Sequence, residues 1–187
     1  MELGTIIFLL IIVGLIGYVV SIYNRLVRLR NQVRNGWRQI DVQLKRRHDL
    51  IPNLVETVKD YMSYEQDTLR QVVEARSRAV ATEGKGPEAA MVAEQGLSGA
   101  LGKLFALMEN YPDLKASQNV QQLMEELAST ENRIAFSRQH YNDSVMAKNV
   151  AVESFPSNIV AGLFGFRQDQ YFEVETHERA VPKVSLR

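Results

Sequence analysis

The sequence predicts an all-α protein: a single N-terminal transmembrane helix, then an antiparallel four-helix bundle with a short irregular C-terminal tail. Two observations predict this fold. An uncharged and almost wholly apolar stretch occupies residues 3–24. Beyond it, apolar residues recur at steps of three and four, which is typical of amphipathic helices. We expect an anchor at 1–24, a bundle at 25–155, and an apolar segment with the tail at 156–187.

The apolar stretch is long enough to span a bilayer, because about 20 apolar residues in a helix cross a hydrocarbon core of ~30 Å. A core helix in so small a domain would not be hydrophobic on every side. A cleaved signal peptide would need a basic start and a small-residue cleavage site. Here the only charged residue before the stretch is the acidic Glu2, and no such cleavage site follows it. We therefore expect an uncleaved transmembrane helix.

The charge distribution predicts the orientation of this helix. Residues 25–47 contain eight basic side chains and a single acidic one, Asp41, whereas 14 basic side chains face 20 acidic ones from residue 48 onward. Positively charged flanks stay in the cytoplasm. We expect the N-terminus outside and the bundle inside, with the first arginines, Arg25, Arg28 and Arg30, as candidates for contact with anionic headgroups.

Within the bundle, we expect helices at about 25–48, 52–82, 88–110 and 118–155. Pro52 marks either a turn, with Asp49 as the helix cap, or a kink in one longer helix, and we favour the turn because proline restricts the residue before it. Glycines and a proline at 84–87 predict a loop, and Pro112 follows the end of the third helix. The last residues alternate weakly and suggest a loose or extended arm.

Composition excludes several kinds of chemistry. The chain has no cysteine, which removes disulfides, thiolate metal sites and cysteine nucleophiles, and it has only three histidines. Its 22 basic and 22 acidic side chains argue against a general nucleic-acid binder. The Glu-x-x-His pairs of di-iron bundles, the His-Glu-x-x-His zinc motif and the phosphate-binding loop are absent from the sequence. We expect no enzymatic activity, no metal and no cofactor.

Polar side chains on or beside the apolar stripes form the first candidate site. Some lie near the end of the first bundle helix and others along the fourth: Asn35, Trp37, Asp41, Arg46, Arg47, His48, Asp49, Glu131, Arg138, Tyr141 and Asn142. Buried charges must be paired, so these residues predict salt bridges between helices. A structural network and a ligand or partner site both remain open.

Three glycines at steps of three, Gly96, Gly99 and Gly102, form a small-residue face on the third helix. Each costs about 1 kcal/mol of helix propensity relative to alanine. We favour close approach of a neighbouring helix of the same chain as the reason. A contact between chains and a locally soft helix are the alternatives.

The segment 155–166, FPSNIVAGLFGF, contains no charge and is too short to span a bilayer. It could be a plug over the open end of the bundle. It could also lie at the membrane surface through Phe155, Leu163, Phe164 and Phe166, if four helices bring the chain back to the lipid. On this second interpretation, the return of the chain to the membrane depends on a turn at Pro52.

Several motifs resemble the LemA family of bacterial membrane proteins. They are YNRLVRLRNQV at 23–33, QIDVQLKRRHDLIPNLVETVK at 39–59, ENYPDLKAS at 109–117, TENRIAFSRQHYNDSV at 130–145 and FPSNIVAGLFGF at 155–166. The resemblance implies an N-terminal anchor with a four-helix bundle in the bacterial inner membrane, and no enzymatic activity or cofactor. It also implies TPM-domain proteins or HtpX-like peptidases as possible partners, and one branch of the family is linked to magnetosome membranes. Gly36 stands where the family more often has alanine.

The leading hypothesis is a non-enzymatic scaffold that organises partner proteins or membrane at the cytoplasmic face, as a homo-oligomer. The alternative is a hydrolytic or metal-dependent enzyme that uses the polar residues of the fourth helix. A sensor that transmits a signal through the membrane is a third class, which the near absence of residues outside disfavours.

Overall fold

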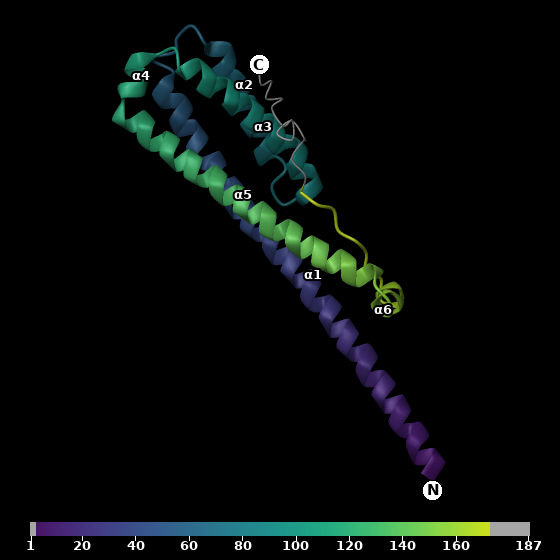
Figure 1. The fold of residues 1–187 in the computed structure, drawn as a ribbon. Helices are drawn as coiled ribbons and strands as arrows, with labels where there is room; N and C mark the ends of the chain where they lie inside the picture. Colours follow the sequence, from purple (N-terminus) through teal and green to yellow (C-terminus); the bar gives the residue numbers. More distant parts are fainter. Residues whose placement is uncertain (1–2, 173–187) are drawn as a thin grey trace, which may run out of the picture. The chain divides into compact units, whose positions relative to one another are not determined.

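The structure, a computed structural model, describes residues 3–172 (Figure 1). Its elements are α1 (Leu3–Val58), α2 (Gln66–Val80), α3 (Pro87–Met108), α4 (Pro112–Ala116), α5 (Gln118–Glu153) and α6 (Ser157–Leu163). The expected all-α class is confirmed, since no strand occurs within these residues. The arm expected at the C-terminus falls in residues 173–187, outside the described part of the chain.

The N-terminal part of α1 is long and apolar enough to cross a membrane, and it alone meets that test in the described chain. Only 6% of its most apolar window is buried inside the protein. A core helix of a soluble protein would be mostly buried. The exposed apolar side chains of this helix therefore lack any cover from the described protein itself.

The chain divides into two compact units. Unit 1 comprises residues 3–46 and 129–171, and unit 2 comprises 47–128 with Phe172. The division passes through α1 and α5, so both helices contribute to both units. The expected division into anchor, bundle and tail stays a prediction.

Unit 1 pairs early residues of α1 with late residues of α5. Leu26 shares a core cluster with Ala151, and Gly36 lies against Tyr141. A Cβ at position 36 would stand 3.1 Å from the Cα atom of Tyr141. Glycine therefore permits a close approach of the two backbones, which an alanine would reach only after a small shift.

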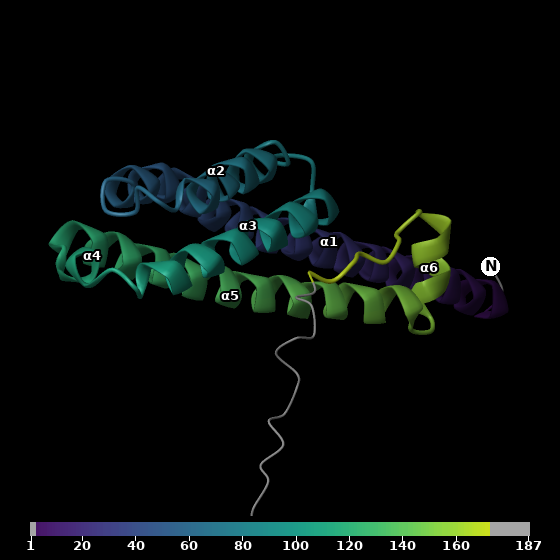
Figure 2. The same ribbon diagram turned by 90° about the horizontal axis from the view of Figure 1, so that it is seen from above.

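Unit 2 has the larger apolar core. It contains buried residues of α1, α2, α3 and α5, with Ile51, Val72, Leu104 and Leu127 among them. Figure 2 shows α2 and α3 side by side, and these two helices share an extensive contact. Burial of the apolar stripes that the sequence displays holds this unit together.

The turn favoured at Pro52 is wrong, and so is the cap at Asp49, because α1 continues through both residues to Val58. The turn occurs at residues 59–65, and α2 begins only at Gln66. Met62 in this turn is fully buried in the core of unit 2. Met62 therefore continues the helical spacing of apolar residues although the helix has ended. For this reason the spacing does not reveal the turn.

The third and fourth expected helices coincide with α3 and α5 to within two residues at each end. The region 156–187 is less irregular than expected, because α6 lies within it. The Ser157 hydroxyl donates to the carbonyl groups of Ala151 and Ser154, at 2.5 and 2.9 Å. These bonds satisfy carbonyls at the end of α5 and start a new helical turn.

The packing of Gly96, Gly99 and Gly102 against another helix of the chain is not found. All three are exposed, and, apart from the adjacent backbone of α3 itself, no atom of the described residues comes within 4 Å of a Cβ built at any of them. They lie on the side of α3 opposite its buried residues, such as Leu97 and Leu104. Within the described residues, the favoured reason for these glycines therefore has no support.

Candidate functional site

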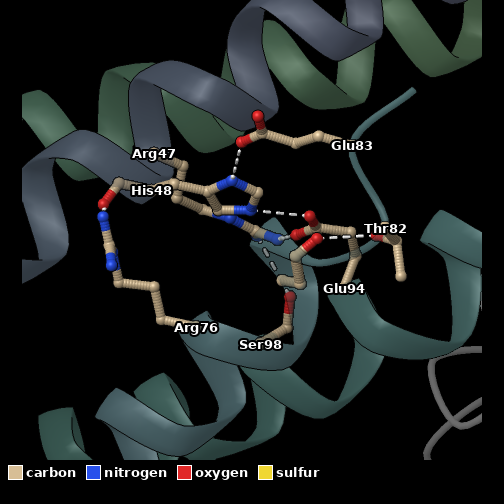
Figure 3. Close-up of polar contacts among 8 residues, drawn as sticks. Arg47, His48, Arg76, Thr82, Glu83, Glu94 and Ser98 are labelled. Carbon is tan, nitrogen blue, oxygen red and sulfur yellow. Dashed lines mark hydrogen bonds and ion pairs between the residues drawn. The ribbon is translucent and has the colours of Figure 1, made fainter. Parts of the chain in front are cut away.

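Unit 2 contains a buried ionic cluster of polar side chains (Figure 3). Arg47 and His48 come from α1, and Glu94 and Ser98 come from α3. Glu83 reaches it from the loop before α3. Glu94 and Ser98 are four residues apart, which places both on one face of α3.

Glu94 lies between the two basic side chains. One carboxylate oxygen, Oε2, accepts a hydrogen bond from the Arg47 guanidinium, and the other, Oε1, lies 2.7 Å from Nε2 of His48. Nδ1 of His48 is 3.2 Å from Oε1 of Glu83, and Nη1 of Arg47 donates to the Ser98 hydroxyl at 3.2 Å. The Arg47 and Glu94 side chains are only 2% and 6% exposed, so the centre of the cluster is buried and its opposite charges compensate one another.

The surroundings favour the charged forms of His48 and Glu94. Burial alone would lower the pKa of His48, but the hydrogen bond and charge of Glu94, with help from Glu83, outweigh it and raise the pKa above 6.5. Burial alone would raise the pKa of Glu94. The hydrogen bond from His48 and the charge of Arg47 outweigh burial there, so the pKa of Glu94 falls below 4.5.

Arg76 of α2 explains why α1 continues through Pro52. Proline has no backbone N–H, so the carbonyl of residue 48 lacks its usual partner four residues later. Nε of Arg76 donates to that carbonyl at 2.7 Å. The side chain of another helix thus replaces the hydrogen bond that Pro52 removes, and the helix survives.

A second polar cluster lies in unit 1 and fastens the chain that follows α6. Lys148 pairs with Asp169 at 2.5 Å. The Asn149 side chain donates to the backbone carbonyl of Asp169 and accepts from its N–H, both at 2.9 Å. The Tyr141 hydroxyl donates to the carbonyl of Gln170 at 3.0 Å. Burial, with the nearby charge of Asp169, raises the pKa of Tyr141 to about 12, so this hydroxyl remains a donor.

A third group surrounds the start of the charged part of α1. Tyr23 contacts Phe164 and Phe166, with ring centroids 4.8 and 5.8 Å apart. The guanidinium of Arg30 stands 5.2 Å from the centre of the Phe166 ring, a cation–π arrangement. Phe166 is buried, so it belongs to the core of unit 1 and does not fit the alternative in which it contacts the membrane surface.

The structure separates the residues that the sequence placed in one polar network. Arg47 joins the cluster of unit 2, while Asp49 is exposed there. In unit 1, Trp37 and Tyr141 meet at 6.1 Å between ring centroids. His48 also lies in unit 2, buried beside Arg47. The remaining members lie in unit 1, where Asn35 and Arg46 are exposed and the rest are half-buried: Asp41, Glu131, Arg138 and Asn142.

Sequence reasoning missed the acidic partner of the central cluster. Glu94 lies within the apolar stripe formed by Ala90, Leu97 and Leu101, and a charge in such a stripe signals a buried pair. Lys148 gives the same signal beside Tyr141 and Val145 on α5. Their partners come from distant parts of the sequence, which periodicity does not identify.

The clusters offer structural pairing rather than an obvious ligand set. Within residues 3–172, no group of three or more acidic, histidine or cysteine side chains is arranged to hold a metal ion. Unit 2 also has an open, mainly apolar cavity of about 240 Å³ between α3, α4 and α5, lined by Phe105, Met108, Leu114 and Met124 among others. The polar clusters take no part in its lining.

Comparison with known proteins gives the family. Residues 36–186 match the LemA family. Over 188 aligned positions the chain is 25% identical to magnetosome protein MamQ of Magnetospirillum gryphiswaldense, covering 86% of this chain and 69% of that protein. It is 27% identical to protein LemA of Metamycoplasma hominis over 177 positions, covering 93% and 80%. The match extends over most of the sequence, so this chain belongs to the LemA family.

Proposed function

We propose that this chain is a membrane-anchored, non-enzymatic helical scaffold that organises partner proteins or membrane at the cytoplasmic face of the bacterial inner membrane. The continuity of α1 carries the proposal. One helix begins with exposed apolar residues and then supplies core residues to both units, with Leu26 in one and Ile51 in the other. Membrane attachment and protein cores thus belong to the same element.

An antiparallel four-helix bundle is the arrangement we propose for the cytoplasmic part. In its support, early residues of α1 pair with late residues of α5 in unit 1. The four longer helices α1, α2, α3 and α5 also contribute to the core of unit 2, together with Leu114 of the short α4. The ionic cluster suits a structural role in such a bundle, because its buried charges are directed at one another.

Family membership and the similarity to magnetosome proteins support a place at a bacterial membrane. The basic side chains that follow the apolar stretch favour the N-terminus outside and the C-terminus in the cytoplasm. A reporter fused after Arg187 should then be active in the cytoplasm. Cleavage of the C-terminal part by protease added to intact cells would contradict this orientation.

The scaffold role is tested by photo-crosslinking in intact cells. A photoreactive residue at Val92, which is 76% exposed on α3, should give adducts with a membrane protein such as a TPM-domain protein or an HtpX-like peptidase. The matched control is the same residue at Leu97, which is fully buried on the same helix. Adducts with lipid alone, or equal adducts from both positions, would contradict a partner-binding surface there.

The competing enzymatic role has a direct test. Protein purified without added metal should contain none in stoichiometric amount. Tightly bound metal that is lost in Glu131→Gln or His140→Ala would overturn the non-enzymatic proposal.

We also propose a homo-oligomer. The open space beside Gly96, Gly99 and Gly102 leaves room for close approach of a second chain. The mass in mild detergent should correspond to more than one chain, and a strictly monomeric mass in detergent and in lipid would contradict association.

A further inference from the structure

The short helix α6 has one face against the protein and another without cover. Val160, Ala161 and Phe166 are buried in a core cluster with Leu26. On the other side, large apolar side chains are exposed: Phe155 by 80%, Leu163 by 76%, Phe164 by 56% and Ile159 by 55%. The segment is therefore both a packed part of unit 1 and an exposed apolar surface.

Contacts with α1 give the level of this surface relative to the apolar stretch. The ring of Phe164 contacts that of Tyr23 at a tilt of 59°, and the core around α6 includes Val19 and Ile22. These three residues of α1 belong to the uncharged run that ends at Asn24. The exposed face of α6 thus adjoins the end of the apolar stretch, at the level where a spanning helix leaves the hydrocarbon (Figure 2).

The charges around this surface also suit a lipid interface. No charged residue occurs in 155–166, the exposed Arg167 follows the segment directly, and the exposed Arg25 and Arg28 follow Tyr23 on α1, which contacts Phe164. The acidic Glu153 nearby accepts a hydrogen bond from Gln168. Apolar and aromatic side chains bordered by arginine are typical of segments that lie between headgroups and acyl chains.

We propose that the exposed face of 155–164 lies in the interfacial layer of the membrane that α1 crosses, as a second lipid contact. Lipid is the occupant because this surface is continuous with the exposed apolar residues of α1, which a hydrocarbon phase would also cover. The inference rests on the membrane attachment in the proposed function. It adds that contact on one side of α1 restricts rotation of unit 1 about the helix axis.

The experiment measures the surroundings of single labels on the full chain. Because the sequence has no cysteine, nitroxide labels can be placed one at a time with Leu163→Cys and Phe155→Cys. The chain is reconstituted into vesicles of phosphatidylcholine and phosphatidylglycerol. Power saturation then compares accessibility to oxygen, which concentrates in lipid, with accessibility to a water-soluble nickel chelate.

Two matched positions calibrate the measurement. Phe136→Cys, where the native side chain is 74% exposed on α5, reports an exposed apolar site away from α6. Ile11→Cys, 63% exposed within the apolar stretch, reports the span itself. We expect oxygen-to-nickel ratios at 155 and 163 several-fold above that at 136 and below that at 11, because residue 11 lies near the middle of the apolar stretch.

The other outcomes overturn the inference in distinguishable ways. Ratios at 155 and 163 equal to that at 136, with position 11 in lipid, would show that α6 faces water while the anchor stands. Loss of access to both reagents at 155 and 163 would show that a second protein chain covers the surface. A nickel-accessible label at 11 would overturn the anchor, and the second lipid contact with it.

Discussion

The two buried polar clusters serve different purposes. In unit 2, Arg47 and His48 of α1 meet Glu94 of α3, so side chains of two regular helices pair with one another. In unit 1, Asn149 and Tyr141 of α5 bind backbone groups of Asp169 and Gln170, which belong to no helix. The first cluster joins two helices, and the second satisfies the backbone of an irregular segment.

The difference shows that helical and irregular segments need polar side chains for different reasons. Helices satisfy their own backbone groups, so polar residues between them serve mainly to match each other and to define which residues face. In an irregular segment, backbone N–H and C=O groups have no partners within the segment, so side chains of a neighbouring helix must supply them. Removal of a charge should therefore affect unit 2 most, and removal of a neutral side-chain bond should affect unit 1 locally.

The largest effect is expected for Glu94→Gln. The change keeps the side-chain volume but leaves the buried Arg47 without a counter-charge, which costs about 3–5 kcal/mol of the free energy of unfolding. Urea unfolding of the full chain in mild detergent, followed by circular dichroism, measures it. Glu83→Gln is the matched control: its carboxylate also faces His48 but is 40% exposed, and its loss should cost at most about 1 kcal/mol. Equal losses would contradict a larger role for the buried carboxylate of Glu94 than for the exposed one of Glu83.

A smaller and more local effect is expected for Asn149→Ala. The variant loses both bonds to the backbone of Asp169, a cost of about 1–3 kcal/mol. Amide hydrogen exchange should accelerate at 167–172 and remain unchanged in α2 and α3. Asn158→Ala, at an exposed position on α6, is the control. Faster exchange throughout unit 2 would show that the two clusters are not separate in function.

Unit 2 also contains one side-chain bond to the backbone, in which Arg76 donates to the carbonyl of residue 48. The contrast between the two units is therefore incomplete. Arg76→Met should destabilise the protein more when Pro52 is present than in a Pro52→Ala background, where residue 52 regains an N–H. We expect a coupling energy of about 1 kcal/mol in this double-mutant cycle. Additive effects would mean that Arg76 does not replace the missing bond.

The smallest effect is expected from pH. The pKa of His48 is raised in the folded state, so its stabilisation is complete below the unfolded value near 6.5 and is lost as pH rises through the folded value. The pKa of Glu94 is lowered, so its contribution is present above about 4.5 and is lost as pH falls through the folded value. A neutral ring still donates one bond, which limits the alkaline loss.

Urea unfolding between pH 6 and 9 tests this sign, with His48→Gln as the comparison. The native chain should lose stability as pH rises, and the variant should lose less. An increase in stability with pH would contradict protonation of His48 in the folded cluster.

Much of the fold follows from local patterns in the sequence. The apolar stripes and the loops at Gly84 and Pro112 predict α3 and α5 nearly to their ends, because helix boundaries of this kind depend on neighbouring residues. The uncharged start of α1 is also visible in composition alone. These features require no knowledge of what lies across the core.

The remainder depends on residues far apart in sequence. Continuity at Pro52 requires Arg76, and burial of Arg47 requires Glu94, so neither could be predicted from the stretch around residue 50. The exposed glycines of α3 show the converse: their spacing suggested a packed face, but no helix of the described chain lies against it. For the candidate site, the sequence predicted that charged side chains would be buried in pairs, but it did not identify which residues pair.

The bond between Arg76 and the carbonyl of residue 48 also has a consequence for the order of folding. During synthesis the whole of α1 emerges before Arg76 does, since that residue lies 18 positions beyond the end of the helix at Val58. Until α2 docks, the backbone carbonyl of residue 48 has no hydrogen-bond donor from the protein, and the last turns of α1 are only weakly stabilised. The distal end of α1 and the docking of α2 should therefore form in one cooperative step, later than the start of the same helix.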